Sequence, residues 1–442
     1  MPRLVVACLL LLVAVPAGAQ DAERPQNLIL LIPDGFGPAS ATLARTFSGA
    51  PLALDGILRG AVTTAATDSR VTDSAASATA YAAGVRTYNG AIGVDTLRRP
   101  VGTILEAAEA RGMATGLVVT SRVTHATPAS FAAHVPNRWM EEVIAVQLME
   151  AGVEVLFGGG RRFFVPEAEG GARTDGRSLL AEMRAGSVTV VTDPAAFDAA
   201  STVPVVGLFA DDHLDYEIDR TDQPSLEAMT QRALGLLSAD PDGFFLMVEG
   251  SRIDHAGHSN DPVGHVHDIL AFDRAVRAAL AFAEADGQTL VVVASDHETG
   301  GLSLGRDGVY AWHPARLRRA TASADRLRRL IAEGGDPLGV LREHAAVDSL
   351  TADEQTLFAE GTPSALTIGR LVSRRMRLGW TTKGHTGIDV GLYAFGPGSE
   401  PLVGVWTNDA LGRRLAGALG LDLEAATARL RAEYLERSAS GD

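Results

Sequence analysis

The sequence predicts an α/β fold with three layers, in which helices cover both faces of a central, mainly parallel sheet. Two observations predict this fold. Short, continuous apolar runs recur along the chain, and such runs are typical of strands that are buried on both faces. Longer segments with helical periodicity lie between the runs, and this alternation is typical of a parallel sheet between layers of helices. The 442 residues, of which 46% are hydrophobic and 21% charged, are enough for a full core.

Seven apolar runs are predicted strands because they are short and largely free of polar residues. In chain order they are residues 27–32, 116–120, 153–157, 203–209, 244–248, 289–294 and 390–395. Between them, amphipathic or alanine-rich segments are predicted helices, at residues 103–110, 141–151, 225–237 and 263–284. The small residues that follow Ser74 also favour a helix that begins at or just after this serine.

Residues 306–378 differ from the rest of the chain because they contain no strong strand run. Arginine-rich helical patterns occur there instead, at residues 323–333, 337–343 and 364–377. We therefore predict one catalytic domain over residues 20–442, with residues 306–378 as an inserted helical subregion near its C-terminal third. This insertion could cover the functional site or form a contact between subunits.

The first 19 residues are predicted to be a signal peptide, so we expect a periplasmic or secreted protein. Arg3 precedes an apolar stretch at residues 4–15, and the small residues at 16–19 suit cleavage before Gln20. No segment reaches the ~20 apolar residues of a spanning helix, so we expect no membrane anchor. Cys8 is the only cysteine, and its removal would leave only carboxylates, imidazoles and hydroxyls as metal ligands.

The charge of the chain argues against nucleic acid as a partner. It has 39 basic and 54 acidic residues, a formal net charge of −15, and no basic run. A surface that binds the phosphate backbone of nucleic acid is usually strongly basic. We therefore expect no nucleic-acid-binding surface.

Acidic residues follow three of the predicted strands directly. Asp34, Glu249 and Asp296 each come at the carboxyl end of an apolar run. In open parallel sheets this edge binds ligands, so we expect the three carboxylates to cluster there. Carboxylates held close together repel one another unless a cation or a proton lies among them. The pattern indicates a metal site.

Histidines accompany these acidic residues. Asp254 and His258 are four residues apart and could face one ion from a helical turn or a tight loop, while His297 and His385 lie beside glycines. Mixed aspartate and histidine ligands suit a hydrolytic zinc site, and oxygen ligands alone suit magnesium. Both kinds of site are consistent with these residues.

Ser74 is the predicted nucleophile. At the start of a helix its hydroxyl would lie among free backbone N–H groups, which favour an alkoxide or a phosphate. No Gly-x-Ser-x-Gly motif surrounds this serine, so activation by a metal is expected rather than activation by an imidazole base.

The order of the motifs resembles that of the alkaline phosphatases, from residue 27 to about residue 398. The matching motifs are Pro33-Asp34-Gly35, Thr72-Asp73-Ser74-Ala75, His125-Ala126-Thr127-Pro128, Asn137-Arg138, residues 249–258, Asp296-His297-Glu298-Thr299 and Gly384-His385-Thr386. Each motif alone is weak, but together and in this order they are specific.

The resemblance implies two Zn²⁺ ions and one Mg²⁺ ion. One zinc would be held by Asp254, His258 and His385, and the other by Asp34, Asp296 and His297 with Ser74 at its open position. The magnesium would be held by Asp34, Thr127 and Glu249. Arg138 would bind two oxygens of the phosphoryl group, and Asp73, His125 and His255 would lie one layer outside the metal ligands.

The resemblance also implies hydrolysis of phosphate monoesters through a covalent phosphoserine, with broad specificity for small substrates and inorganic phosphate as the product. A phosphodiesterase or a sulfatase of the same superfamily is the alternative, and a non-catalytic protein stabilised by metal is a more distant one. Many family members are dimers, so a homodimer is an open possibility.

Overall fold

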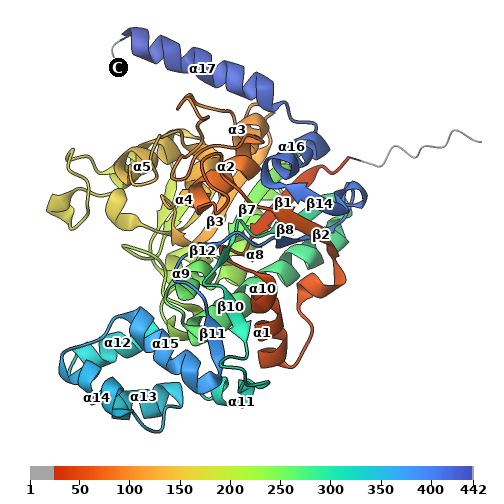
Figure 1. The fold of residues 1–442 in the computed structure, drawn as a ribbon. Helices are drawn as coiled ribbons and strands as arrows, with labels where there is room; N and C mark the ends of the chain where they lie inside the picture. The colour runs from red at the N-terminus through yellow and green to blue at the C-terminus, as the bar shows by residue number, and fades with distance from the viewer. Residues whose placement is uncertain (1–23, 441–442) are drawn as a thin grey trace, which may run out of the picture.

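The computed structural model describes residues 24–440, and the predicted signal peptide, residues 1–19, lies outside this range. Its centre is a sheet of ten strands between two layers of helices (Figure 1). In spatial order the strands are β14 (Gly404–Thr407), β2 (Leu58–Thr63), β13 (Val390–Phe395), β8 (Thr289–Ala294), β1 (Asn27–Ile32), β7 (Phe244–Glu249), β3 (Ala114–Arg122), β4 (Val155–Gly159), β6 (Val205–Leu208) and β5 (Thr189–Val191). Only β13 runs antiparallel to its neighbours.

Strand β1 illustrates why the apolar runs are continuous. Ile29 and Leu31 face one hydrophobic core, whereas Leu28, Leu30 and Ile32 face the other, and all five side chains are fully buried. Successive side chains of a strand point to opposite faces, so a strand covered on both sides needs apolar residues at every position. This confirms the predicted three-layer α/β fold.

Each core is closed by its own set of helices. The core around Ile29 is covered by α1 (Pro38–Ser48), α7 (Pro194–Ala199), α8 (Leu226–Leu237), α9 (Arg252–His258) and α10 (Pro262–Asp286). The core around Leu30 is covered by α2 (Ser74–Ala83), α3 (Ile104–Glu109), α4 (Ala126–Ala132), α5 (Glu141–Glu150), α6 (Leu179–Ala185) and α16 (Asn408–Leu419), and α17 (Leu423–Ser440) follows α16. Short 3₁₀ helices occur at Ala53–Gly56, Arg161–Phe163, Glu167–Glu169, Glu217–Asp219 and Glu400–Leu402.

Residues 306–378 contain five helices, which lie together at the lower edge of the molecule (Figure 1). They are α11 (Pro314–Leu317), α12 (Ala324–Ala332), α13 (Pro337–Ala345), α14 (Ala352–Ala359) and α15 (Ala365–Met376). Two small antiparallel sheets connect this part to the functional site: β10 (Leu302–Leu304) pairs with β11 (Leu378–Trp380), and β9 (Glu298–Thr299) pairs with β12 (His385–Thr386). Leu327 and Ile368 belong to the same core as Ile29, so the helices pack on the main domain.

All seven predicted strands are present, but β2, β5 and β14 were not predicted. Strand β2 has only one buried residue, Val62, and its neighbour β14 exposes Val405 at the edge of the sheet. Strand β5 has only three residues. None of the three is a continuous apolar run, which is why the pattern missed them.

Candidate active site

The candidate active site lies at the carboxyl ends of three neighbouring parallel strands. Strand β1 pairs with β8 on one side and with β7 on the other, and Ile32 of β1 is in register with Glu249 of β7. Asp34 follows β1, Glu249 ends β7, and Asp296 follows β8. Their side chains are fully buried. The parallel order of the strands therefore brings three carboxylates from distant parts of the chain to one edge.

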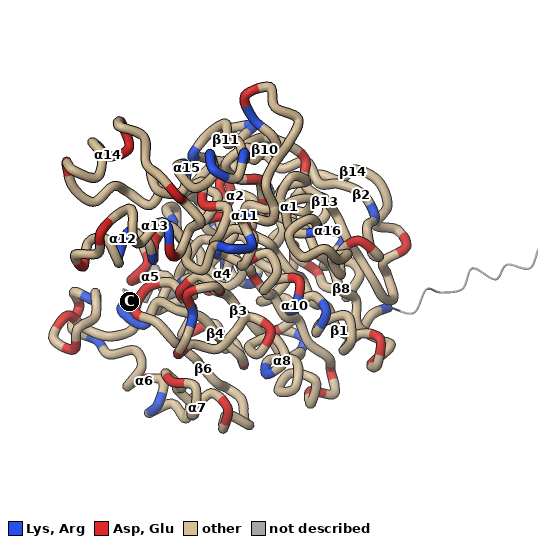
Figure 2. Tube along the Cα trace, turned by 90° about the horizontal axis from the view of Figure 1, so that it is seen from below, with Lys and Arg blue, Asp and Glu red and all other residues tan. Residues whose placement is uncertain are grey.

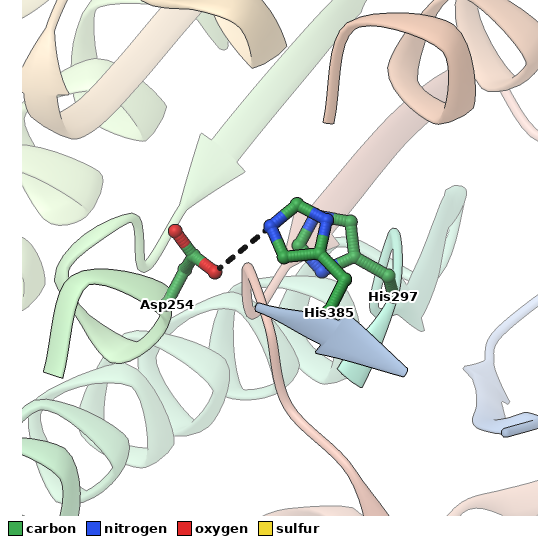
Figure 3. Close-up of side chains that lie close together, drawn as sticks. All are labelled: Asp254, His297 and His385. Atoms are coloured by element: carbon green, nitrogen blue, oxygen red, sulfur yellow. Dashed lines mark ion pairs between the residues drawn. The ribbon is translucent and has the colours of Figure 1, made fainter. Parts of the chain in front are cut away.

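One group of possible metal ligands contains Asp254, His297 and His385, whose ligand atoms lie within 4.8 Å of one another (Figure 3). His258 joins this group, because its Nε2 is 3.3 Å from Asp254 Oδ2 and 3.2 Å from His385 Nε2. His385 Nε2 is 3.6 Å from Asp254 Oδ1, and the rings of His297 and His385 stack with centroids 3.5 Å apart.

A second group surrounds Nε2 of His297. This atom is 3.1 Å from Ser74 Oγ, 3.2 Å from Asp296 Oδ2 and 3.6 Å from Asp34 Oδ1. Burial and the nearby His385 lower the pKa of His297 well below its usual value, so the ring is neutral. A neutral imidazole nitrogen among carboxylate oxygens is a donor set that suits zinc.

A third group contains Asp34, Glu249 and His125, whose ligand atoms also lie within 4.8 Å of one another. Thr127 follows His125 by two residues, in the first turn of α4. Its hydroxyl is buried and has no hydrogen-bond partner. His125 is the N-cap residue of α4. The structure therefore places His125 among the possible ligands, whereas the sequence analysis placed it one layer outside them.

Backbone carbonyls orient two of the histidines. His258 Nδ1 lies 2.6 Å from the carbonyl oxygen of Lys383, and His385 Nδ1 lies 2.8 Å from that of Thr72. Each Nδ1 donates a proton to its carbonyl, which leaves Nε2 as the nitrogen that can bind a metal. Metal-binding histidines usually have such a second hydrogen bond, which fixes the tautomer.

Burial and mutual repulsion disfavour the charged forms of three of the clustered carboxylates. Burial first, and then Asp296 and Asp254, raise the pKa of Asp34 well above its usual value. Burial also raises the pKa values of Asp296 and Glu249 to about 7, with further contributions from neighbouring carboxylates. Burial likewise acts to raise the pKa of Asp254, but the histidines around it outweigh burial and hold this pKa well below the usual value.

Several buried polar atoms in this region have no hydrogen-bond partner. They are both carboxylate oxygens of Asp34, Oε1 of Glu249, Oδ2 of Asp296, Oγ1 of Thr127 and Nδ1 of His125. Buried polar atoms normally have partners, because an unpaired one costs about 1–3 kcal/mol. Unpaired carboxylate, hydroxyl and imidazole atoms that lie close to one another are the arrangement expected of ligands for divalent cations.

Asp73 links Ser74, the next residue in the chain, to Arg138. Ser74 is the first residue of α2, and Asp73 caps this helix by accepting the N–H of Ala76 at 3.0 Å. Asp73 also accepts a hydrogen bond from Arg138 Nη1 at 3.0 Å, and Nη2 of Arg138 lies 3.0 Å from Nε2 of His125. Asp73 therefore fixes both the start of the helix and one side of the guanidinium group.

A family model for alkaline phosphatase matches residues 25–421. The chain belongs to the alkaline phosphatase family. It is 41% identical over 432 residues to the repressible alkaline phosphatase of Saccharomyces cerevisiae, which covers 85% of this chain and 76% of the yeast protein. The crystal structure of Thermus thermophilus alkaline phosphatase is similar, with a TM-score of 0.83, 32% identity, and coverage of 95% of this chain and 99% of that one.

A second similar structure is a histidine-to-aspartate variant of TAB5 alkaline phosphatase with Mg bound in its M3 site. It has a TM-score of 0.68 and 30% identity, and covers 90% of this chain and 99% of that one. Membership of the alkaline phosphatase family confirms the predicted class of enzyme, a metal-dependent hydrolase of phosphate monoesters. Among residues 24–440, no helix combines the length and the apolar character that crossing a bilayer requires.

Two residues with clear contacts to this alkaline phosphatase site were not singled out from the sequence. Thr299 donates its hydroxyl to Asp254 and lies 3.2 Å from His297 Nδ1. His213, from the loop after β6, packs against His255 with ring centroids 4.3 Å apart and against His125 at 5.6 Å. Thr299 belongs to a matching motif and could have been found there, whereas His213 is isolated in the sequence.

Asn260 connects the end of α9, which carries His258, to the segment that leads into β12, which carries His385. Its side chain donates to the carbonyl oxygens of Gly257 and Thr382, both at 2.9 Å, and accepts from Arg370 of α15 at 2.9 Å. It is fully buried, with a left-handed φ of 46°, which asparagine adopts more readily than most residues do. A Cβ on Gly369 of α15 would lie 2.3 Å from the carbonyl oxygen of Ser259, so glycine is required for this contact.

We expect Asn260→Gly to weaken zinc binding about 10–100-fold, as is typical when a residue behind a metal ligand is lost. Glycine keeps the left-handed backbone but removes the bonds that hold the end of α9, with His258, to the segment before His385. Zinc titration with a competing chelator measures the change. Asn408→Gly, which also removes a buried, hydrogen-bonded asparagine side chain, is the matched control and should bind zinc normally. Equal zinc affinity in Asn260→Gly and the unaltered enzyme would contradict the role given to Asn260.

Proposed function

We propose that the protein hydrolyses phosphate monoesters through a covalent phosphoserine on Ser74, at a site that holds two Zn²⁺ ions and one Mg²⁺ ion. The main support is the position of Ser74 Oγ, 3.1 Å from Nε2 of His297, which itself lies among the oxygens of Asp34 and Asp296. A hydroxyl that shares a cation with these ligands can be activated as a nucleophile without an imidazole base.

The donor sets agree with the proposed ions. Asp254, His258 and His385 would hold one zinc, and Asp34, Asp296 and His297 the other. Oxygen ligands from Asp34, Thr127 and Glu249 suit magnesium, and His125 adds one imidazole to this group. When bound, the ions would lower the pKa of the attacking hydroxyl and stabilise charge on the leaving oxygen.

The protein's own residues would carry out the displacement as follows. Ser74 loses its proton to solvent and attacks phosphorus, so that a serine–phosphate bond forms while the bond to the ester oxygen breaks, and this oxygen takes a proton from solvent and leaves as the alcohol. The N-terminus of α2 favours negative charge at this position. Water then cleaves the serine–phosphate bond, releases inorganic phosphate and returns a proton to Ser74.

Arg138 would bind the phosphoryl oxygens through its planar guanidinium group. Asp73 and the ring of Trp139, 5.5 Å from the guanidinium carbon, hold the group in place, and its side chain is only 14% exposed. Two parallel N–H donors match two oxygens of a monoester, which carries one more charged oxygen than a diester.

We expect Arg138→Lys to raise KM for p-nitrophenyl phosphate about 10–100-fold, because lysine keeps the charge but loses the fork. Steady-state kinetics measure this effect. Arg162→Lys, a partly exposed arginine in the 3₁₀ helix Arg161–Phe163 that pairs with Asp212, is the control and should leave KM unchanged. If Arg138→Lys and the unaltered enzyme had equal KM values, the role of Arg138 in binding phosphate would be contradicted.

Turnover of three related compounds tests the reaction class. We expect p-nitrophenyl phosphate to be hydrolysed much faster than bis(p-nitrophenyl) phosphate or p-nitrophenyl sulfate. A diester or sulfate rate that exceeds the monoester rate would favour the alternative function, a phosphodiesterase or a sulfatase.

We also propose that residues 1–19 direct export and are then removed. This proposal rests on the sequence of these residues, which lie outside the described part of the chain. N-terminal sequencing of the protein from the periplasm or the medium should begin at Gln20. An unprocessed N-terminus on exported protein would contradict the predicted cleavage site.

A further inference from the structure

A strongly basic hollow of about 610 Å³ lies between α11 and the end of α15, apart from the metal ligands. Basic segments gather around the labels α11, α15 and β11 on the face shown in Figure 2. Five of the lining residues are arginines, and one is a histidine: Arg316, Arg319, Arg374, Arg375, Arg377 and His313. Such a concentration of positive charge is unexpected in a chain with a net charge of −15. It comes from two separate segments, residues 313–319 and 374–377, which the fold brings together.

Three of these arginines form no salt bridge within the described residues 24–440. Arg316 pairs with Asp348 at 3.2 Å, and Arg375 pairs with Glu354. Within residues 24–440, no hydrogen bond or ion pair involves the guanidinium groups of the other three, which are Arg319, Arg374 and Arg377. Asp307, which pairs with Arg306, lies near Arg374 and Arg377 and offsets part of their charge, so the hollow keeps a net positive charge.

The backbone at Arg377 has a conformation that is uncommon for a residue other than glycine. This residue follows α15 with a φ of 56°, in the left-handed region. Helices often end in this conformation, but the residue there is usually glycine, because a side chain is strained. The conformation nevertheless places an arginine in the wall of the hollow. Strained residues of this kind cluster at ligand-binding sites.

The arginine side chains of the hollow favour a ligand with phosphate groups. Arginine presents a planar set of donors that match the oxygens of a phosphate group, and three unpaired guanidinium groups can neutralise more charge than one phosphate carries. The volume also exceeds that of a single phosphate. Six of the seven lining residues have basic side chains, which favours an anionic ligand.

We propose that this hollow binds a small anion with two or more linked phosphate groups, at a site separate from the proposed active site. An alternative structural role for the arginines is stabilisation of the C-terminus of α15, where basic residues favour the helix dipole. The two roles differ in an observable way. A helix-stabilising role changes the Tm of the free protein, whereas a binding role changes the affinity for the anion.

Isothermal titration of the metal-loaded enzyme with methylenediphosphonate tests the proposal, because the carbon bridge of this anion cannot be hydrolysed. We compare the unaltered enzyme with Arg319→Gln/Arg374→Gln/Arg377→Gln, which leaves the proposed active site intact. The unaltered enzyme should show one more binding site than this triple variant, or affinity for that site at least about tenfold higher. Turnover of p-nitrophenyl phosphate should be the same in both, which separates this proposal from the proposed function.

Arg184→Gln/Arg326→Gln/Arg328→Gln is the matched control, because it makes the same change in net charge outside the hollow. This control should bind methylenediphosphonate as the unaltered enzyme does. Equal binding by all three proteins would overturn the proposal, as would equal weakening in the two variants. Orthophosphate that fills the additional site as tightly as methylenediphosphonate would overturn the requirement for linked phosphates. A lower Tm of the free first variant, with unchanged binding, would assign the arginines to helix stability.

Discussion

Replacing Ser74 by alanine is expected to lower kcat for p-nitrophenyl phosphate by at least about 10³-fold, because the covalent route loses its nucleophile. The fold should persist. Ser74 is 2% exposed at the start of α2, and alanine is a better helix former than serine. The three residues proposed to hold this zinc, Asp34, Asp296 and His297, are unchanged in Ser74→Ala, so the metal content should change little. Steady-state kinetics and elemental analysis of the same preparation measure both quantities.

Ser77→Ala is the matched control, because Ser77 is a buried serine in the same helix that contacts Asn408 and no ligand. It should retain turnover. Mass spectrometry of the acid-quenched enzyme should find a phosphorylated peptide that contains Ser74, and this peptide should be missing from Ser74→Ala. Unchanged turnover in Ser74→Ala would return Ser74 to a structural role and favour the non-catalytic alternative.

Removal of metal is expected to abolish turnover and to destabilise the protein. Without cations the buried carboxylates of Asp34, Asp296 and Glu249 repel one another, and several of their oxygens have no partner. A chelator should therefore lower the Tm, and zinc with magnesium should restore both the Tm and the activity. Turnover that survives complete removal of metal would contradict the proposed mechanism.

The free energy of unfolding of the metal-free protein should fall as pH rises. In the metal-free protein, burial and neighbouring carboxylates raise the pKa values of Asp296 and Glu249 to about 7, above the ordinary values of 3.8 and 4.5. The folded chain then binds more protons than the unfolded chain between about pH 4 and pH 7. Its free energy of unfolding falls as pH rises through this window and levels off above it.

His258 extends the same trend to higher pH. Burial lowers its pKa, but Asp254 more than compensates, so that the pKa rises from 6.5 to about 9. The stability from this pair is present below about pH 6.5 and is lost as pH rises through about 9. The metal-loaded enzyme should behave differently, because its ligands bind metal better as they lose protons. Thermal unfolding of both forms across this range measures the difference, and parallel curves would contradict it.

The sequence alone predicted those parts of the molecule where a local pattern of residues has a single structural explanation. Strands such as β1 and β8 are buried on both faces, so their apolar runs were unambiguous. The meeting of Asp34, Glu249 and Asp296 followed from the geometry of parallel strands. Strand β14 was not predicted because it is held mainly by backbone bonds to β2 and leaves its side chains exposed.

Contacts that depend on tertiary structure could not be predicted from the sequence. His213 reaches His255 only because the loop after β6 folds over the edge of the sheet, and nothing around it in sequence indicates this. The basic hollow is similar, since Arg319 and Arg374 are 55 positions apart and meet only when α11 lies beside α15. The position of His125 among oxygen ligands also required the structure.

The pairing of β12 with β9 has a consequence for how the enzyme matures. His385 reaches Asp254 only through this short ladder, after the chain has passed through all the helices of residues 306–378. A growing polypeptide that stops before this point lacks one imidazole of the first group. If this group holds zinc as proposed, full loading must follow synthesis of nearly the whole protein, and C-terminal truncation before His385 should give a chain that cannot retain its complete metal complement.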